Sequence, residues 1–287
     1  MRKILITGGA GYVGSKLALA LEKKGYEVEV FDKPKDIENL ADVSSSITEE
    51  VDAVYHLAAL AELSYTDEHP EETYDVNIKG TENICKICVE KKVLLNFIST
   101  CCIYGEPLEL PSREDGLINP TDTYAMSKAA GEYIVKMWHL SKGLRYNILR
   151  LGTVYGQSIN KEMRDDMCVQ KFLEATMKGE PLTIKGDGKQ VRNFIHIDDL
   201  TRALVAVAEK KVENQTINIA GKETISVEDI ASLAMKIGKS KKIIYKPERK
   251  DDFRNQNISI WKAKQLPGWV PRVRFAEGIK EFYEWLK

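Results

Sequence analysis

Two side chains in the middle of the chain, Tyr124 and Lys128, have the types and the spacing for acid–base chemistry. Residues four apart on a helix lie on one face, so the phenol and the ammonium group project from the same side. A lysine held close to a tyrosine favours the phenolate and lowers the pKa of the phenol from its usual value of about 10. The pair therefore predicts a tyrosine that acts as a base at neutral pH. The spacing alone is common, and by itself it more often marks a packed tyrosine beside a solvated lysine.

A glycine-rich turn near the N-terminus reverses those odds, because it predicts a redox cofactor. The apolar run over residues 3–7 predicts a strand, and Gly8-Gly9-Ala10-Gly11-Tyr12-Val13-Gly14 follows it and leads into a helical pattern. Glycines let backbone N–H groups approach a pyrophosphate, and the helix adds the positive end of its dipole. Asp32 ends the next predicted strand, 18 residues after Gly14. A carboxylate there accepts hydrogen bonds from both ribose hydroxyls and repels a 2′-phosphate, so the turn predicts NAD rather than NADP.

The elements that must position these residues alternate between strand and helix. Only nine residues separate Asp32 from Asp42, which leaves little room for a second full crossover helix. The alternation predicts an α/β fold, a Rossmann-type doubly wound parallel sheet whose ligands bind at the carboxyl ends of the strands. The predicted strands and helices of this part cover residues 3–7, 27–32, 53–57, 94–99 and 146–150, and residues 12–24, 71–90 and 123–141.

The composition changes after Gly156, where charge and glycine increase. We therefore expect residues 1–156 to form an NAD-binding domain and residues 157–287 to form mainly a smaller α/β substrate-binding region, with a segment near 190–220 returning to the first. The elements predicted here are helices near 166–178 and 198–210, strands at 194–196, 215–219 and 242–246, and two further helices in the tail.

Charge and cysteine content exclude several classes of protein. Lys and Arg total 42 against 43 acidic residues, so the net charge of −1 gives no reason to expect nucleic acid or a membrane as a partner. No apolar run approaches the roughly 20 residues that span a bilayer. The four histidines are scattered, and no metal site is predicted. Cys85 and Cys88 lie in a helical pattern, which favours buried thiols over a disulfide or a redox site, and a reducing, cytoplasmic location is the simplest interpretation.

The sequence resembles the extended short-chain dehydrogenase/reductases, specifically the nucleotide-sugar epimerase/dehydratase group, which includes UDP-glucose 4-epimerase. The resemblance covers about residues 3 to 286 and extends beyond the turn and the Tyr–Lys pair. It includes His56-Leu57-Ala58-Ala59, Asn77-Ile78-Lys79-Gly80-Thr81, Ser99-Thr100-Cys101-Cys102-Ile103-Tyr104-Gly105, Leu149-Arg150 with Val154-Tyr155-Gly156, and Gly186-Asp187-Gly188-Lys189-Gln190-Val191-Arg192-Asn193-Phe194.

The resemblance implies a set of site residues for NAD and for a nucleotide-diphosphate sugar. Thr100, Tyr124 and Lys128 are the implied catalytic residues, with the Thr100 hydroxyl beside Tyr124 on the substrate oxygen. Substrate contacts are implied for Thr100, Tyr124, Thr153, Arg192 and Arg249, the two arginines holding the diphosphate. The implied cofactor contacts are Gly8, Gly11, Tyr12, Val13, Gly14, Asp32, Lys33, Asp42, Val43, Leu57, Ala58, Ala59, Asn77, Ser99, Tyr124 and Lys128.

The two residues after Thr100 bear on the reaction. By the resemblance, 4,6-dehydratases carry an Asp-Glu pair there and decarboxylating relatives carry a Glu, whereas this chain has Cys101 and Cys102. The resemblance therefore favours an epimerase that oxidises C4 transiently over a dehydratase or a decarboxylase. A net NAD-dependent dehydrogenase or reductase and a non-catalytic NAD-binding regulator remain alternatives. Many relatives pair through the helices corresponding to residues 71–90 and 123–141, so a homodimer is expected by analogy.

Overall fold

In the computed structural model, which describes residues 2–159, 167–248 and 253–287, the sheet that carries the site is wholly parallel. The predicted α/β doubly wound fold is confirmed. Among the described residues its six strands lie in the order β2 (Glu27–Phe31), β1 (Lys3–Thr7), β3 (Val51–His56), β4 (Leu94–Thr100), β5 (Tyr146–Leu151) and β9 (Gln215–Ile219).

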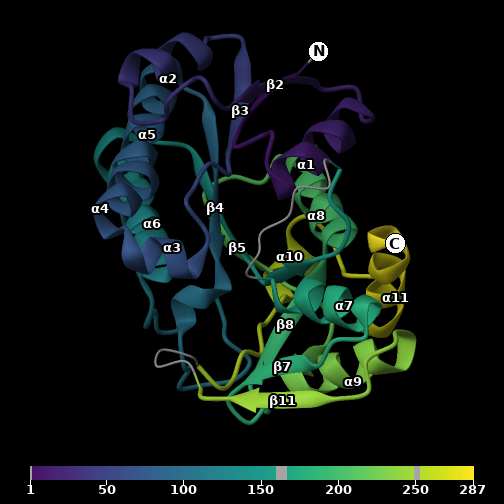
Figure 1. Cartoon of the computed structure of the whole chain (residues 1–287). Helices are drawn as coiled ribbons and strands as arrows, with labels where there is room; N and C mark the ends of the chain where they lie inside the picture. Colours follow the sequence, from purple (N-terminus) through teal and green to yellow (C-terminus); the bar gives the residue numbers. More distant parts are fainter. Residues whose placement is uncertain (1, 160–166, 249–252) are drawn as a thin grey trace.

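Helices cover both faces of this sheet (Figure 1). One face packs against α1 (Tyr12–Glu22) and α8 (Ile197–Glu209), with Leu17 and Leu204 in the buried cluster. The other face packs against α5 (Gly80–Lys91) and α6 (Thr123–Lys142). The short gap after Asp32 holds only the seven-residue helix α2 (Leu40–Ser46), as its length predicted.

The helix that carries Tyr124 and Lys128 has clear local start and stop signals. The carboxylate of Asp122 accepts a hydrogen bond from the backbone N–H of Ala125 at 2.7 Å, which caps the first turn of α6. Gly143 ends the helix in the left-handed region at φ 73°, where glycine carries no steric penalty. Between β3 and α5 the chain forms α3 (Leu63–Glu68), α4 (Pro70–Thr73) and a π-helical segment at Tyr74–Lys79.

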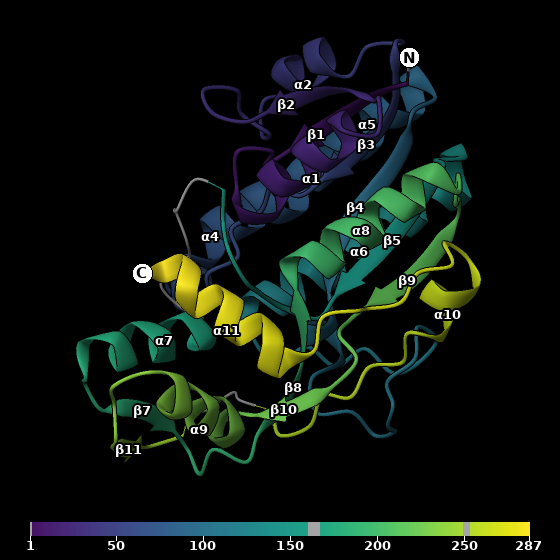
Figure 2. The same cartoon turned by 90° about the vertical axis from the view of Figure 1, so that its right-hand side faces the viewer.

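The rest of the chain forms a smaller α/β lobe beside the carboxyl ends of the strands (Figure 2). Two parallel strands, β7 (Leu182–Lys185) and β11 (Ile243–Lys246), pack with α7 (Cys168–Lys178), α9 (Val227–Ile237) and α11 (Phe275–Leu286) around one apolar cluster. A separate three-stranded sheet lies between the lobe and the parallel sheet, in the order β10 (Thr224–Ser226), β8 (Val191–His196), β6 (Thr153–Tyr155).

The structure corrects the expected pattern of the tail and adds strands that the sequence pattern did not indicate. In the described part of the chain beyond residue 223 there are three helices rather than two, because the five-residue α10 (Trp261–Gln265) lies between α9 and α11. The strands β6, β7 and β10 were not predicted, and they are only three or four residues long, too short to show a period. Among the described residues, no helix combines the length and the hydrophobicity needed to cross a bilayer.

Candidate active site

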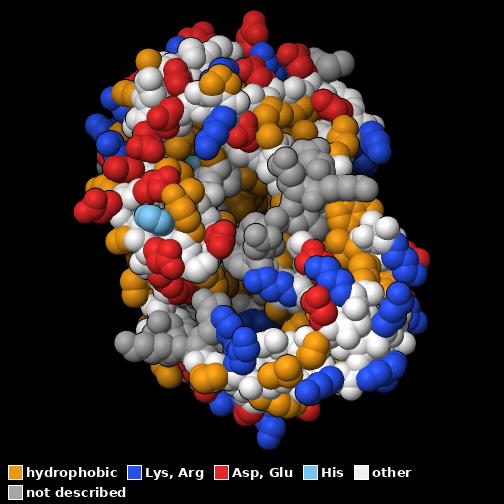
Figure 3. All heavy atoms as spheres, viewed as in Figure 1, with side chains coloured by type: hydrophobic (Ala, Val, Ile, Leu, Met, Phe, Trp, Pro, Cys, Tyr) orange, Lys and Arg blue, Asp and Glu red, His pale blue; other side chains and the backbone are white. Residues whose placement is uncertain are grey.

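One continuous cavity of about 1810 Å³ runs from the glycine turn to the smaller lobe. Ligand pockets usually enclose roughly 300–1,000 Å³, so this cavity has room for two ligands side by side. Figure 3 shows its opening, with Lys and Arg side chains gathered at the end formed by the smaller lobe and Asp and Glu side chains over α3 and α4. Lys171, Lys185 and Arg192 line the basic end, which favours an anionic ligand there.

The amino end of α1 faces the cavity and fits a pyrophosphate. Gly11 is the N-cap of this helix and has no side chain to cap it, and the first turn contains no acidic residue. Its backbone N–H groups and the positive end of the helix dipole therefore remain directed at a ligand. The Asp32 carboxylate lies beside the turn, where it accepts hydrogen bonds from the backbone N–H groups of Ala10 and Lys33, both at 2.9 Å. The N–H donors of the helix end and the Asp32 carboxylate, an acceptor, together suit the dinucleotide that the turn predicts.

Two glycines allow the turn to pack this tightly. Gly8 has φ 68°, and a Cβ there would lie 2.7 Å from the backbone nitrogen of Ala58. A Cβ on Gly14 would lie 2.2 Å from the carbonyl oxygen of Gly8, far inside van der Waals contact. The turn and the helix can therefore meet only if these positions carry no side chain.

Replacing Gly14 by Ala is expected to weaken NAD binding about tenfold or more, because the turn must move away from the helix N-terminus that holds the pyrophosphate. Calorimetric titration of nucleotide-free protein with NAD measures this loss. Gly25→Ala is the matched control: Gly25 has φ 82° but nothing lies within 4 Å of an added Cβ. That variant should lose about 1 kcal/mol of stability from backbone strain and keep its NAD affinity. Equal NAD affinity in the two variants would contradict the assignment.

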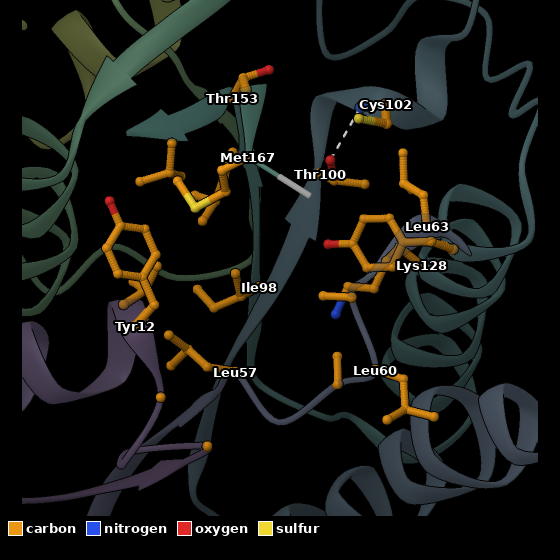
Figure 4. Close-up of a pocket in the computed structure, with 18 of the residues that line it drawn as sticks. Tyr12, Leu57, Leu60, Leu63, Ile98, Thr100, Cys102, Lys128, Thr153 and Met167 are labelled. Atoms are coloured by element: carbon orange, nitrogen blue, oxygen red, sulfur yellow. Dashed lines mark hydrogen bonds between the residues drawn. The ribbon is translucent and has the colours of Figure 1, made fainter. Parts of the chain in front are cut away.

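The three predicted catalytic residues line the same part of the cavity. Tyr124 and Lys128 come from the first two turns of α6, and Thr100 is the last residue of β4. The Thr100 hydroxyl oxygen accepts a hydrogen bond from the backbone N–H of Cys102 at 3.1 Å, so its own proton can be directed elsewhere. In Figure 4, Thr100 and Lys128 lie on one side of the cavity and Tyr12 on the other.

Lys128 is nearly fully buried, and this burial sets its ionisation. Loss of water contact lowers the pKa of its ammonium group to about 7, while the nearby Glu132 carboxylate opposes that fall. The Nζ atom also lies 4.4 Å from the centre of the Phe97 ring, a cation–π contact that favours the charged form. In the nucleotide-free protein the lysine therefore changes charge near neutral pH.

Asn77 and His56 do not line the cavity; their hydrogen bonds connect segments next to it. The Asn77 side chain accepts a hydrogen bond from the Leu60 backbone N–H at 2.8 Å, and it donates to the Leu60 carbonyl and to the Ser127 hydroxyl, both at 2.9 Å. His56 bonds Thr7 and Thr81 through its two ring nitrogens. Burial and the charge of Lys128 lower its pKa to about 3, so it stays neutral.

Most other predicted site residues also line the cavity, whereas Asp42, Val43 and Asn77 are absent from its lining. The carboxylate of Asp42 accepts a hydrogen bond from the backbone N–H of Asp36, and Val43 is fully buried in the core. Arg249 lies outside the described residues. The lining includes the remaining predicted contacts Gly8, Gly11, Tyr12, Val13, Gly14, Asp32, Lys33, Leu57, Ala58, Ala59, Ser99, Thr153 and Arg192.

The structure adds two residues that the sequence pattern did not single out, Phe253 and Glu132. The Phe253 ring lies with its centre 3.8 Å from the guanidinium carbon of the predicted substrate contact Arg192, on β8, and both residues line the basic end of the cavity. Nothing in the sequence joins these two residues. Glu132 was also missed, although it continues the four-residue spacing of Tyr124 and Lys128 and so had a signal.

Comparison with known proteins identifies what the chain is similar to. Residues 4–220 match the model of the NAD dependent epimerase/dehydratase family. A UDP-glucose 4-epimerase from Thermotoga maritima, solved with UDP-glucose, superposes with a TM-score of 0.93 at 30% identity, over 99% of this chain and 98% of that one. A UDP-glucuronic acid 4-epimerase from Bacillus cereus, solved with UDP-glucuronic acid and NAD, gives 0.90 at 32% identity, with the same coverage. UDP-glucuronic acid decarboxylase 1 of Arabidopsis thaliana is 32% identical over 96% of this chain and 68% of its own length.

Proposed function

The chain belongs to the NAD-dependent epimerase/dehydratase family, and we propose that it is an enzyme that inverts C4 of a nucleotide-linked sugar with bound NAD. One observation carries this proposal. Thr100, Tyr124 and Lys128 line a single cavity that begins at an uncapped helix N-terminus and has room for a dinucleotide and a second ligand. UDP-sugars are the first substrates to test, because similar proteins were solved with UDP-glucose and UDP-glucuronic acid.

Each member of the trio has a distinct task in this proposal. The Tyr124 phenolate takes the proton of the C4 hydroxyl, and Thr100 donates a hydrogen bond to the same oxygen. Lys128 supplies the positive charge that keeps the phenol ionised. Bound NAD would supply the reversible hydride acceptor that transient oxidation at C4 requires. The glycine turn, Asp32 and the Leu57–Ala59 wall would hold it.

The residues after Thr100 support an epimerase over a decarboxylase. Cys101 is buried and donates to the Arg150 carbonyl oxygen at 3.4 Å, and burial raises the pKa of its thiol well above the usual range. Cys102 lines the cavity beside Thr100. Neither position offers the carboxylate that, by the resemblance, decarboxylating relatives carry there.

At the other end of the cavity, Arg192 suits the substrate diphosphate, because a planar guanidinium binds phosphate oxygens in pairs. Arg192→Met is expected to raise the KM for a UDP-sugar about tenfold or more while kcat changes little, because a contact with the diphosphate holds the substrate and takes no part in the reaction at C4. Initial rates over a range of substrate concentration measure both constants. Lys189→Met removes an exposed cation next to the same strand and is the control. A fall in kcat at constant KM would contradict the role in binding.

A direct assay separates the candidate reactions. The purified protein is denatured to identify its nucleotide, and native protein is incubated with UDP-, GDP- and dTDP-sugars, including UDP-glucuronic acid, under NMR observation. Epimerisation gives the C4 epimer with no net change in NADH. Steady NADH release would indicate a net dehydrogenase, and loss of the carboxyl carbon from UDP-glucuronic acid would indicate a decarboxylase. Either result would replace the epimerase proposal.

The domain division, the oligomeric state and the cellular location are also proposals. We propose the division into an NAD-binding part, residues 1–156 with the returning segment that contains α8 and β9, and a substrate-binding part over most of residues 157–287. We also propose a homodimer that covers the exposed apolar side chains of α6, among them Met126, Tyr133, Met137 and Leu140. Light scattering of the purified protein tests the dimer. A cytoplasmic location likewise stays a prediction.

A further inference from the structure

Behind the proposed catalytic residues lies an ion pair that no solvent reaches. Glu132 is the third residue in the four-residue series Tyr124, Lys128, Glu132 on α6, and its side chain is fully buried. Arg150, on β5, is 1% exposed. Its Nε and terminal nitrogen donate to the two Glu132 oxygens at 2.9 and 2.7 Å, the paired geometry that a carboxylate and a guanidinium favour. Burying such a pair has a large desolvation cost, so its presence is weak evidence for a role in stability alone.

The pair joins the elements that carry the trio. The Ser99 hydroxyl donates to the Glu132 carboxylate at 2.7 Å, and Ser99 directly precedes Thr100 at the end of β4. Arg150 also donates to the Tyr104 hydroxyl at 2.7 Å and to the Glu114 carbonyl at 3.0 Å. The carboxylate of Glu132 therefore fixes the end of β4 against α6, which sets Thr100 relative to Tyr124 and Lys128. Ser99 was predicted as a cofactor contact, but its hydroxyl proton is donated to the Glu132 carboxylate.

The same carboxylate faces the charge on Lys128. The groups around Lys128 are Tyr124 one turn earlier on α6, Glu132 one turn later, His56 from β3 and the Phe97 ring from β4. His56 is neutral, and Arg150 is already paired with Glu132. Among the described residues that act on Lys128, Glu132 is the anion that favours the ammonium form against burial.

We propose that Glu132 is a positioning residue of the active site, whose carboxylate sets Thr100 against the Tyr124–Lys128 pair and keeps Lys128 protonated. This rests on the proposed function for the roles of Thr100 and Lys128. Glu132 itself lies outside the cavity lining, so it touches neither cofactor nor substrate.

The test titrates Lys128 directly, without substrate. In nucleotide-free protein labelled with ¹³C-lysine, the resonance missing from Lys128→Met identifies the residue, and its titration near pH 7 separates it from ordinary lysines. Glu132→Gln is expected to move the midpoint down by about one pH unit or more and to lower kcat about tenfold or more, with KM for the UDP-sugar changed less than about twofold. In the pH profile of kcat, the fall in activity at high pH should begin at a lower pH for the Glu132→Gln variant than for the parent.

A second variant guards against a protein that fails to fold, because Glu132→Gln leaves Arg150 charged and buried. The double variant Glu132→Gln with Arg150→Met removes both charges and should still lower the midpoint, by less than Glu132→Gln alone, because no uncompensated Arg150 charge remains. Asp199→Asn is the matched control: Asp199 is also buried and paired with an arginine, Arg202, but it holds the backbone of Arg272 and Val273 far from Lys128. It should lower stability and leave the Lys128 midpoint unchanged.

A purely structural role for Glu132 predicts loss of stability alone. An unchanged Lys128 midpoint in the double variant, or an unchanged kcat in folded Glu132→Gln protein, would overturn the proposal. A shifted midpoint in a protein that converts no nucleotide sugar would instead sustain the link between Glu132 and Lys128 and refute the proposed function.

Discussion

Tyr124→Phe is expected to lower kcat on a UDP-sugar about 10²–10⁴-fold, because the variant keeps the ring and loses the group that takes the proton. NAD affinity should change little, since the glycine turn and Asp32 stay intact. Two measurements check this result. NMR follows conversion of the sugar, and absorbance of the nucleotide released on denaturation gives the NAD content.

Tyr133→Phe is the matched control for this variant. Tyr133 lies on the same helix but outside the cavity lining, so loss of its hydroxyl should leave turnover within about twofold of the parent. Activity of the Tyr124→Phe protein within about tenfold of the parent would remove Tyr124 from the mechanism. Loss of bound NAD in that variant would point to a cofactor-binding role instead.

Lys128→Met is expected to stabilise the nucleotide-free protein, and more so at low pH. Burial lowers the pKa of Lys128 from 10.5 to about 7 on folding. Below about pH 7 the Lys128 ammonium group stays charged while buried, so the folded protein carries the whole desolvation penalty. Between these two pKa values the unfolded chain binds more protons than the folded one, so the stability of the parent rises with pH. The advantage of the methionine variant should therefore shrink by about 3 kcal/mol between pH 7 and 9.5, at 1.36 kcal/mol per pKa unit.

Urea unfolding at several pH values measures this difference. Lys142→Met, an exposed position at the end of the same helix, is the control, and its stability difference from the parent should be small at every pH. A stability gap between Lys128→Met and the parent that stays constant with pH would show that Lys128 is not buried in its charged form. The same variant should also lose turnover, because Tyr124 loses its charged neighbour.

Local sequence determined the parts of this protein whose chemistry depends on neighbours along the chain. The strand at residues 3–7, the glycine turn and the α1 helix follow one another directly, so the pattern alone predicted a dinucleotide site and the doubly wound sheet. Tyr124 and Lys128 share one helix, whose face is fixed by the four-residue spacing. Asp122 and Gly143 cap the two ends of that helix, and both are residue types that favour those capping positions.

Contacts between distant segments were decided only by the tertiary structure. The buried network joins Glu132 on α6 to Arg150 on β5 and Ser99 on β4, and no local pattern pairs those three residues. No local pattern pairs the Phe253 ring with Arg192 either. Burial is also a property of the fold: it lowers the pKa of Lys128 to about 7, whereas the sequence shows only a lysine. Periodicity and capping act over a few residues, but desolvation and charge pairing depend on which strands and helices the parallel sheet places side by side.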